Sequence, residues 1–405
     1  MATFFILIIY LAFISLGLPD SLLGSAWPVM RVELGASIGT AGVISMAIAG
    51  CTIVSSLASG AVIRRYGVGA VTLVSCMLTA GALLGFAWSP SLVWLIVFAI
   101  PLGLGAGSVD AGLNNYVALH YKAHHMSWLH CFWGVGATLS PMIMASYISG
   151  EALWRQGYLT VAAVQGSLVL ILLFSLPLWD KVAARSRGSR PEERHEPETQ
   201  VREPASEAES GSTKPWRIKG VRVSMIAFLF YCGVESSVGL WGSSFLVGMK
   251  KLPASTAAEW VSLFFVGITV GRMITGFITF GVSNRSLIRC GQLTALFGTV
   301  LLALPLPSGF SLAGFMVIGL GLAPIFPCML HETPARFGNK HSQSIMGFQM
   351  AAAYTGSTFV PPLLGALASY STIGILPFFI VAFAAIMLIC SERLNRFLNR
   401  KPQAI

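Results

Sequence analysis

The sequence predicts an all-α membrane protein with twelve transmembrane helices in two pseudo-symmetric halves of six. Three observations lead to this fold class: an extreme composition, a series of long apolar runs, and two short motifs that recur in the second half of the chain. Of the 405 residues, 55% are hydrophobic and only 10% are charged. Soluble globular domains carry about 25% charged residues, so the composition excludes that class.

The apolar runs are each long enough to cross a bilayer, which needs about 20 residues of helix. The first run has no basic segment before it and no cleavage site after it, so we interpret it as a retained span rather than a signal peptide. The predicted spans, joined mostly by short loops, cover residues 3–30, 38–63, 68–88, 91–120, 126–149, 153–179, 221–248, 256–280, 286–305, 309–333, 342–370 and 372–391.

One connection is long and polar. Residues 180–220 are rich in Arg, Glu, Ser and Pro, a composition typical of a solvated, flexible linker. The sequence therefore predicts an N-terminal six-helix half over residues 1–179, a cytoplasmic linker over 180–220, and a C-terminal six-helix half over 221–405.

Two motifs of the first half recur in the second. Asp20-Ser-Leu-Leu-Gly24 returns as Glu235-Ser-Ser-Val-Gly239, and Gly136-Ala-Thr-Leu-Ser-Pro141 returns as Gly356-Ser-Thr-Phe-Val-Pro361. Each motif alone is short enough to arise by chance. Their common order predicts two related halves around a central site.

Basic residues are unequally distributed between the two faces of this topology. The net charge is +10, yet of the 26 Lys and Arg only Arg31, Arg155, Lys250 and Lys251 fall on one face. By the positive-inside rule, both termini are expected in the cytoplasm. We expect the membrane to be the inner (plasma) membrane of a bacterium. The charge is thus no sign of nucleic-acid binding.

The seven cysteines show neither metal-ligand nor disulfide spacing, so we expect no metal site and no cofactor. We expect a monomer, since one chain suffices for a central site.

Asp20 lies somewhat past the middle of the first span, where an ionised side chain is costly. Gly17, Gly24 and Trp27 share its helical face. Small residues allow a neighbouring helix or a ligand to approach closely. We therefore expect Asp20 to face protein or water rather than lipid.

Span 4 carries the second acid, Asp110, on one face with Gly103, Gly107 and Asn114. This face suits close packing beside a polar cavity. The alternative is an aspartate satisfied by local hydrogen bonds at a helix contact. Asn114 and its neighbour Asn115 are candidates for hydrogen bonds to a solute.

His130 and Trp133 lie on one stripe of span 5. Alone, a histidine is more often structural, and a tryptophan near a membrane is more often an interfacial anchor. Together in mid-span, beside a helix that bears an acid, they predict a ligand pocket in which the indole offers a flat apolar face.

The second half contributes fewer candidates. Glu235 is its only mid-span acid, with Tyr231 one turn before it, and Gln349 in span 11 occupies the repeat position beside His130. Arg272 lies well inside span 8, toward the cytoplasmic end. It either forms an internal gating ion pair or extends to the interface.

Asp20, Asp110 and Glu235 are the acids deep in the predicted spans, and the spacing predicts no cation at their level. Low dielectric disfavours the charged form of a carboxyl group, which lets such a group load and release a proton near neutral pH. The sequence thus predicts proton coupling by these three acids and gating by Arg272. The predicted substrate-binding residues are Asn114, Asn115, His130, Trp133, Tyr231 and Gln349.

The loops after spans 2 and 8 carry a further pattern. Gly60-Ala-Val-Ile-Arg-Arg-Tyr-Gly67 follows span 2, while Gly271-Arg272 and Gly281-Val-Ser-Asn-Arg285 stand at the end of span 8. Twelve spans in six-plus-six form with these glycine–basic turns resemble the major facilitator superfamily and imply its fold. The usual aspartate of the first motif is replaced by Arg64, so its customary gating ion pair is not implied.

Spans 1, 4 and 5 resemble the fucose:proton symporter family within that superfamily. Pro19-Asp20 matches its Asn-Asp-like stretch, and Gly107-Ser-Val-Asp110-Ala-Gly-Leu-Asn114 matches its Gly-x-x-Glu-x-x-x-Asn run. Leu129-His130-Cys-Phe132-Trp133-Gly-Val-Gly136-Ala137 matches a run in which the family has sugar-contacting Gln and Asn at the positions of His130 and Trp133, with a one-residue shift before Phe132. The resemblance implies coupling by the acids and leaves the substrate open.

Three functions compete at this point. The first is proton-coupled symport of a sugar or similar small polar solute by alternating access, with sodium as an alternative coupling ion. The second is a proton-coupled drug or metabolite efflux antiporter, which the sparse amides and many aromatic residues favour. The third, a membrane enzyme or receptor, lacks a nucleophile–base pair, a metal cluster and an appended domain. We therefore expect a transporter and not an enzyme.

Overall fold

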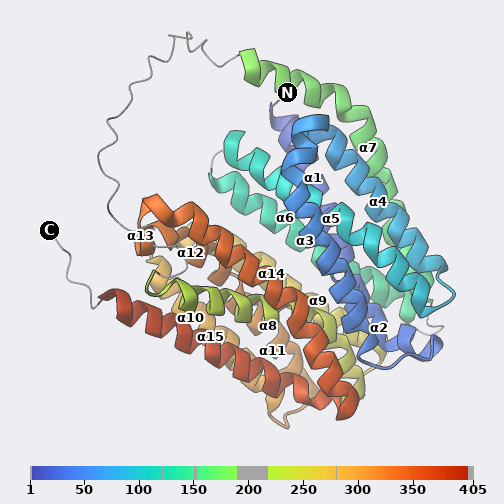
Figure 1. Cartoon of the computed structure of the whole chain (residues 1–405). Helices are drawn as coiled ribbons and strands as arrows, with labels where there is room; N and C mark the ends of the chain where they lie inside the picture. The colour runs from blue at the N-terminus through green and yellow to red at the C-terminus, as the bar shows by residue number, and fades with distance from the viewer. Residues whose placement is uncertain (1, 121–122, 150–152, 189–217, 280, 400–405) are drawn as a thin grey trace.

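The computed structural model describes residues 2–120, 123–149, 153–188, 218–279 and 281–399, and these residues are almost entirely helical. Figure 1 shows two bundles of long helices, one built from the first half of the chain and one from the second. The helices are α1 (Ala2–Asp20), α2 (Leu22–Glu33), α3 (Thr40–Tyr66), α4 (Val68–Trp88), α5 (Leu92–His120), α6 (Ala123–Ile148), α7 (Trp154–Gly188), α8 (Val221–Lys250), α9 (Ala254–Ile278), α10 (Asn284–Ala303), α11 (Ser308–Leu322), α12 (Ile325–His331), α13 (Thr333–Phe337), α14 (Asn339–Tyr370), the short 3₁₀ turn η2 (Ile373–Ile375) and α15 (Leu376–Asn399).

Among the described residues, eleven helical stretches are long and apolar enough to cross a membrane. α14, with 32 residues, occupies the place of the remaining predicted span but is less apolar than those eleven. The predicted all-α membrane fold is thus confirmed. The boundaries of the two halves stay a prediction. α7 continues as helix to Gly188, past the predicted start of the linker, and most of the linker lies outside the described residues.

The predicted first span is divided into two helices at Ser21. Pro19 has no N–H to donate to the preceding turn, which weakens the helix just before this point. The side chain of Ser21 turns to α6, where its Oγ donates to the carbonyl oxygen of Ala137 at 2.8 Å. Because the helix is interrupted here, Asp20 is the last residue of α1. Its side chain lies beside α6 rather than facing lipid.

The recurring glycines make the same contact in each half. A Cβ added at Gly136 of α6 would collide with the carbonyl oxygen of Ile14 in α1, and one added at Gly356 of α14 would collide with the carbonyl oxygen of Leu229 in α8. At both places two helix backbones lie in direct contact, which a larger residue would prevent. The second sequence echo therefore corresponds to a repeated packing contact.

The two halves meet backbone to backbone at one end of the molecule. A Cβ at Gly24 in α2 would collide with the carbonyl oxygen of Gly239 in α8, so the glycines of the first repeated motif touch one another. Nearby, the backbone N–H of Gly39 donates to Ser369 Oγ at 3.1 Å, which ties the start of α3 to the end of α14.

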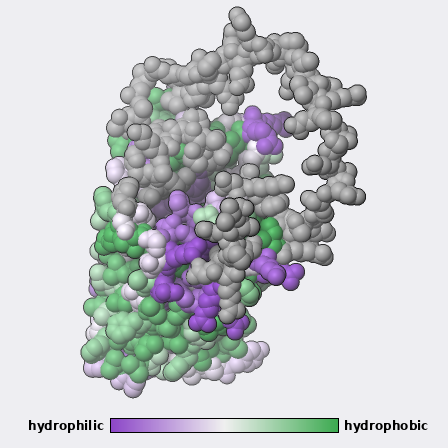
Figure 2. Space-filling model, turned by 90° about the vertical axis from the view of Figure 1, so that its left-hand side faces the viewer, coloured by the Kyte–Doolittle hydropathy of each residue, from purple (hydrophilic) through white to green (hydrophobic). Residues whose placement is uncertain are grey.

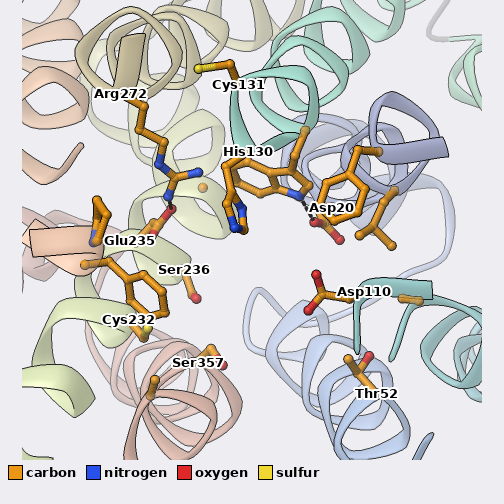
Figure 3. Close-up of a pocket in the computed structure, with 18 of the residues that line it drawn as sticks. Asp20, Thr52, Asp110, His130, Cys131, Cys232, Glu235, Ser236, Arg272 and Ser357 are labelled. Atoms are coloured by element: carbon orange, nitrogen blue, oxygen red, sulfur yellow. Dashed lines mark hydrogen bonds and ion pairs between the residues drawn. The ribbon is translucent and has the colours of Figure 1, made fainter. Parts of the chain in front are cut away.

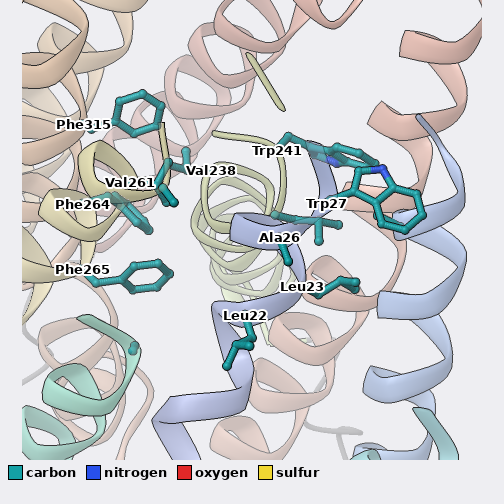
Figure 4. Close-up of a cluster of buried hydrophobic side chains, with 14 of the residues drawn as sticks. Leu22, Leu23, Ala26, Trp27, Val238, Trp241, Val261, Phe264, Phe265 and Phe315 are labelled. Carbon is teal, nitrogen blue, oxygen red and sulfur yellow. The ribbon is translucent and has the colours of Figure 1, made fainter. Parts of the chain in front are cut away.

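Aromatic side chains fill the space behind this contact (Figure 4). Trp27 and Trp241 are fully buried, and their indole N–H groups donate to the carbonyl oxygens of Ile38 and Pro361 at 3.0 and 2.9 Å. Because both polar atoms are satisfied, the cluster excludes water at little cost. This end of the molecule is therefore closed by a dry apolar layer that spans both halves.

The opposite end carries a group of ion pairs. Arg289 on α10 forms a bidentate pair with Glu392 on α15, both bonds being 2.6 Å, and Glu332 pairs with Arg336 at 3.1 Å and with Arg285 at 3.3 Å. Figure 2 shows hydrophobic residues over the lower part of one face and hydrophilic residues above them, toward this end.

Candidate functional site

A cavity of about 1420 Å³ lies between the two halves. Its lining comes from both halves, from helices α1 to α7 on one side and from α8, α9, α10, α12 and α14 on the other. The lining reaches Asn284 and His331 at the polar end, whereas the glycine contact at Gly24 shuts the other. A solute therefore has access from one end of the molecule in this conformation.

Asp20 faces this cavity and is held in place by a contact with the neighbouring helix α6. Its side chain is exposed to the cavity, and its Oδ2 accepts a hydrogen bond of 2.8 Å from the indole Nε1–H of Trp133 on α6 (Figure 3). Gly17, one turn earlier, lets the two helices approach, since a Cβ there would collide with the carbonyl oxygen of Trp133. The expectation that Asp20 faces protein or water agrees with this geometry.

Arg272 points into the cavity and pairs with Glu235 across α8 and α9. Its Nη2 lies 3.6 Å from Glu235 Oε1, with 14% and 17% of the two side chains exposed. The prediction that no cation lies at the level of the deep acids was wrong. Arg272 is separated from Glu235 by 37 positions in chain order, so helix spacing within one span gave no sign of the pair.

Trp133 lies between these groups. The Arg272 guanidinium carbon is 5.2 Å from the centroid of the indole ring, a cation–π contact, while the ring nitrogen binds Asp20. Figure 3 shows Arg272 and Glu235 on one side of the cavity and Asp20 on the other. Both the edge and one region of the ring face are thus occupied by protein groups.

Asp110 lines the cavity from α5, on the same side as Asp20 (Figure 3). Its Oδ1 accepts a hydrogen bond of 2.8 Å from Asn114 Nδ2, four residues on. Asn114 is not among the residues that line the cavity, and its Oδ1 is buried with no partner among the described residues. The local hydrogen bond considered from the sequence is therefore present, together with the cavity. The side chain of Asn115 lies outside the described residues.

His130 lines the same cavity, and its ring packs edge-on against Phe13 with ring centroids 6.0 Å apart. The predicted grouping of His130 and Trp133 on one face of α6 is present in the structure. Asn114, predicted to bind the solute together with His130 and Trp133, does not line the cavity, because its amide donates to Asp110.

Two predicted binding residues do not reach the cavity. Gln349 is 1% exposed, its Nε2 donates to Ser224 at 2.7 Å, and its Oε1 accepts from Thr333 at 2.9 Å. Tyr231 is likewise 1% exposed and is absent from the lining. The next residue of α14, Met350, does line the cavity, because one residue turns a helix face by about 100°.

Sequence reasoning also missed polar residues that the structure places at the cavity. They are Thr52, Cys131, Cys232, Ser236, Tyr354 and Ser357. A signal existed for α14: Met346, Met350, Tyr354 and Ser357 recur at helical spacing and form one stripe. The described residues contain no group of three His, Cys, Asp or Glu placed to hold a metal ion.

Taken together, the site can bind a polar solute and hold protons. Two carboxyl groups of the N-terminal half face an ion pair of the C-terminal half across one water-accessible space.

Comparison with known proteins places this arrangement in context. Residues 9–331 match the family model of the Major Facilitator Superfamily. The glucose/mannose transporter GlcP of Bacillus subtilis is 26% identical over 319 residues, which are 76% of this chain and 74% of that protein. Bypass of stop codon protein 6 of Saccharomyces cerevisiae is 23% identical over 387 residues, which are 90% of this chain and 76% of that one.

Solved structures share the fold at low sequence identity. The inward open conformation of the xylose transporter XylE from E. coli superposes with a TM-score of 0.75 at 12% identity, covering all of this chain and 98% of that chain. The nucleoside transporter NupG, as its D323A mutant, superposes with a TM-score of 0.71 at 14% identity, covering 96% and 98%.

Proposed function

This chain belongs to the major facilitator superfamily, and from that premise we propose that it is a secondary active transporter that carries a sugar or similar small polar solute together with a proton. The observation that carries the proposal is the position of Asp20 and Asp110. Both acids line one central cavity in the N-terminal half, and the cavity is open at a single end. An acid that meets water from one side at a time is suited to picking up a proton on one side and releasing it on the other.

The solute class follows from the lining and from the relatives. Asp110, His130, Ser236, Tyr354 and Ser357 line the same cavity and offer hydrogen-bond donors and acceptors to a solute. GlcP is named a glucose/mannose transporter and XylE a xylose transporter, which supports a sugar as the first class to test. Hydroxyl groups of a pyranose ring would match such a sparse polar lining.

A screen of ligands by thermal stability tests this proposal. A bound solute stabilises the folded protein by an amount that grows with its concentration relative to the dissociation constant. We expect D-glucose, D-mannose or D-xylose to raise the melting temperature of the purified protein more at pH 5.5 than at pH 8, because the loaded carrier is protonated. Mannitol and sucrose serve as controls for nonspecific stabilisation. Sugars without effect at either pH contradict the assigned solute class.

A second function is favoured by the apolar part of the lining. Phe265, Phe326, Met273, Met346 and Met350 surround the polar groups and suit an amphipathic solute. The same screen therefore includes lipophilic cations such as tetraphenylphosphonium. Stabilisation by these cations at high pH, with no effect of sugars, identifies the proton-coupled efflux antiporter instead.

The open end of the cavity is proposed to face the cytoplasm, with both termini and the linker on that side, because the basic residues gather there. In a variant without the native cysteines, Ser91→Cys should react with an impermeant maleimide added outside intact bacterial cells. Ser91 is exposed in the loop after α4. Ser189→Cys, in the predicted linker, should react only after the cells are opened, and the reverse pattern contradicts this orientation.

A further inference from the structure

One residue of the N-terminal half touches both an acid of its own half and the ion pair of the other. Trp133 donates its indole N–H to Asp20 at 2.8 Å, and its ring lies 5.2 Å from the Arg272 guanidinium, which in turn lies 3.6 Å from Glu235. The four groups come from α1, α6, α9 and α8. They form a continuous row of contacts across the interface between the halves (Figure 3).

The backbone around Trp133 is fixed on both sides. Gly17 of α1 packs against the carbonyl group of Trp133, and Gly134 packs so closely against Thr269 of α9 that a Cβ would collide with its hydroxyl group. The indole therefore stands between one contact within its half and one contact to the other half. Rotation of the halves relative to one another must change the distance from the indole to Arg272.

The charge on Asp20 determines how firmly the indole is held. A hydrogen bond from an N–H group to an ionised carboxylate is shorter and stronger than one to a neutral carboxyl group. The ring face carries the negative end of a quadrupole that attracts the guanidinium. Since Glu235 attracts the same guanidinium, a displacement of the indole changes how Arg272 is shared between the ring and Glu235.

Other groups surround this row and act on it directly. The titratable or charged side chains that line the same cavity near Asp20 and Trp133 are Cys76 on α4, Asp110 on α5, His130 and Cys131 on α6, Cys232 and Glu235 on α8, Arg272 on α9 and Tyr354 on α14. Asp110 accepts a hydrogen bond from Asn114, whereas Arg272 pairs with Glu235. The direct electrostatic effect of Asp20 on Arg272 is thus the alternative that an experiment must separate from a contact through the ring.

We propose that Trp133 is a positioning residue that transmits the charge state of Asp20 to the Arg272–Glu235 pair in the opposite half, and that it is not primarily the apolar platform for the solute. The proposal rests on the proposed function in one respect, that Asp20 carries the coupled proton. It revises the role expected from the sequence, because the N–H and part of the ring face are already used by protein groups.

NMR of the solute-free protein tests the transmission directly. With 15N-labelled tryptophan and arginine, the Trp133 and Arg272 signals are identified by their loss in Trp133→Phe and Arg272→Lys. We expect both signals to move with pH at one common midpoint and to stop moving in Asp20→Asn. In Trp133→Leu the Arg272 signal should no longer follow that midpoint. If it still follows with unchanged amplitude, direct electrostatics carry the effect and the proposal is wrong.

Two further variants separate the N–H from the ring. Trp133→Phe keeps an aromatic face for Arg272 but removes the donor to Asp20, so the Arg272 signal should lose most of its pH-dependent shift. Because the lost N–H no longer stabilises the carboxylate, Asp20 itself should titrate about one pH unit higher. Trp94→Phe removes an indole that is half exposed on the outer face of α5 and should leave the midpoint in place. Melting temperatures confirm that each variant is folded. An Arg272 signal that still follows the titration of Asp20 with unchanged amplitude in Trp133→Phe contradicts the role of the N–H.

A binding assay with D-glucose links the transmission to function. In the wild type the affinity should fall as pH rises, and in Trp133→Phe the same fall should occur about one pH unit higher. Asp20→Asn should remove this dependence, and adding Trp133→Phe to it should change nothing further. An affinity lowered equally at every pH in Trp133→Phe marks a solute platform and contradicts the proposal. A pH dependence that survives in Asp20→Asn overturns the proposed coupling instead, while the NMR result still decides the role of Trp133.

Discussion

Asp110→Asn and Asp20→Asn should each abolish accumulation of the solute against its gradient while the protein still exchanges solute across the membrane. An amide resembles the protonated carboxyl group in shape and charge, so the variant behaves as a carrier that is permanently loaded. Without a proton to release, the pH gradient supplies no free energy to the cycle. For Asp110→Asn we expect solute affinity within about threefold of the wild type, and uptake driven by a pH gradient reduced at least about a hundredfold.

Reconstituted vesicles with an imposed pH gradient provide the measurement. Efflux and counterflow of labelled solute report exchange, and concentration above the external level reports coupling. Glu259→Gln is the matched control, because Glu259 is an exposed acid on α9 outside the cavity lining and its variant should accumulate solute normally. If both aspartate variants still concentrate solute in response to the gradient, neither acid carries the proton, and Glu235 or His130 takes its place.

Removing one member of the Arg272–Glu235 pair should destabilise the protein strongly. The two side chains are mostly enclosed, so Arg272→Met leaves the Glu235 carboxylate without its cation in a low-dielectric setting. Breaking a buried pair in this way costs several kcal/mol, and we expect about 2–4 kcal/mol because the cavity admits some water. The loss should be visible as a melting temperature several degrees lower in detergent.

The double variant Arg272→Met with Glu235→Gln should recover most of that stability, because no uncompensated charge remains. Solute transport should not recover, since the link from Trp133 to the opposite half is gone. Arg289→Met, which breaks an exposed pair with Glu392 at the polar end, is the control and should leave the melting temperature nearly unchanged. Equal losses in the single and double variants indicate that Arg272 acts by packing rather than by charge.

The parts of the site that followed from the sequence are those in which one helix carries the signal. Asp20 and Gly17 lie at helical spacing, and so do Asp110 and Asn114. In the structure Gly17 lets α6 approach Asp20, and Asn114 donates a hydrogen bond to Asp110. The helix number and the recurring glycine at Gly136 were likewise readable, because apolar length and small-residue motifs are local properties.

The parts that did not follow depend on where two helices meet. Nothing in the spacing of α8 or α9 indicates that Arg272 and Glu235 face one another, and a pair across helices is fixed only by packing. Gln349 shows a second limit. The repeat located the correct helix but missed the face by one residue, so a polar amide was expected where Met350 lies.

The contact of Gly24 with Gly239 has a consequence for the kind of motion this protein can make. Two backbones that touch without intervening side chains have no flexible atoms to absorb a partial displacement. The halves at this end are either in register or apart, and intermediate separations would leave an unfilled gap lined by carbonyl groups. We therefore expect the halves at this end to separate in a single step between two discrete arrangements rather than by degrees.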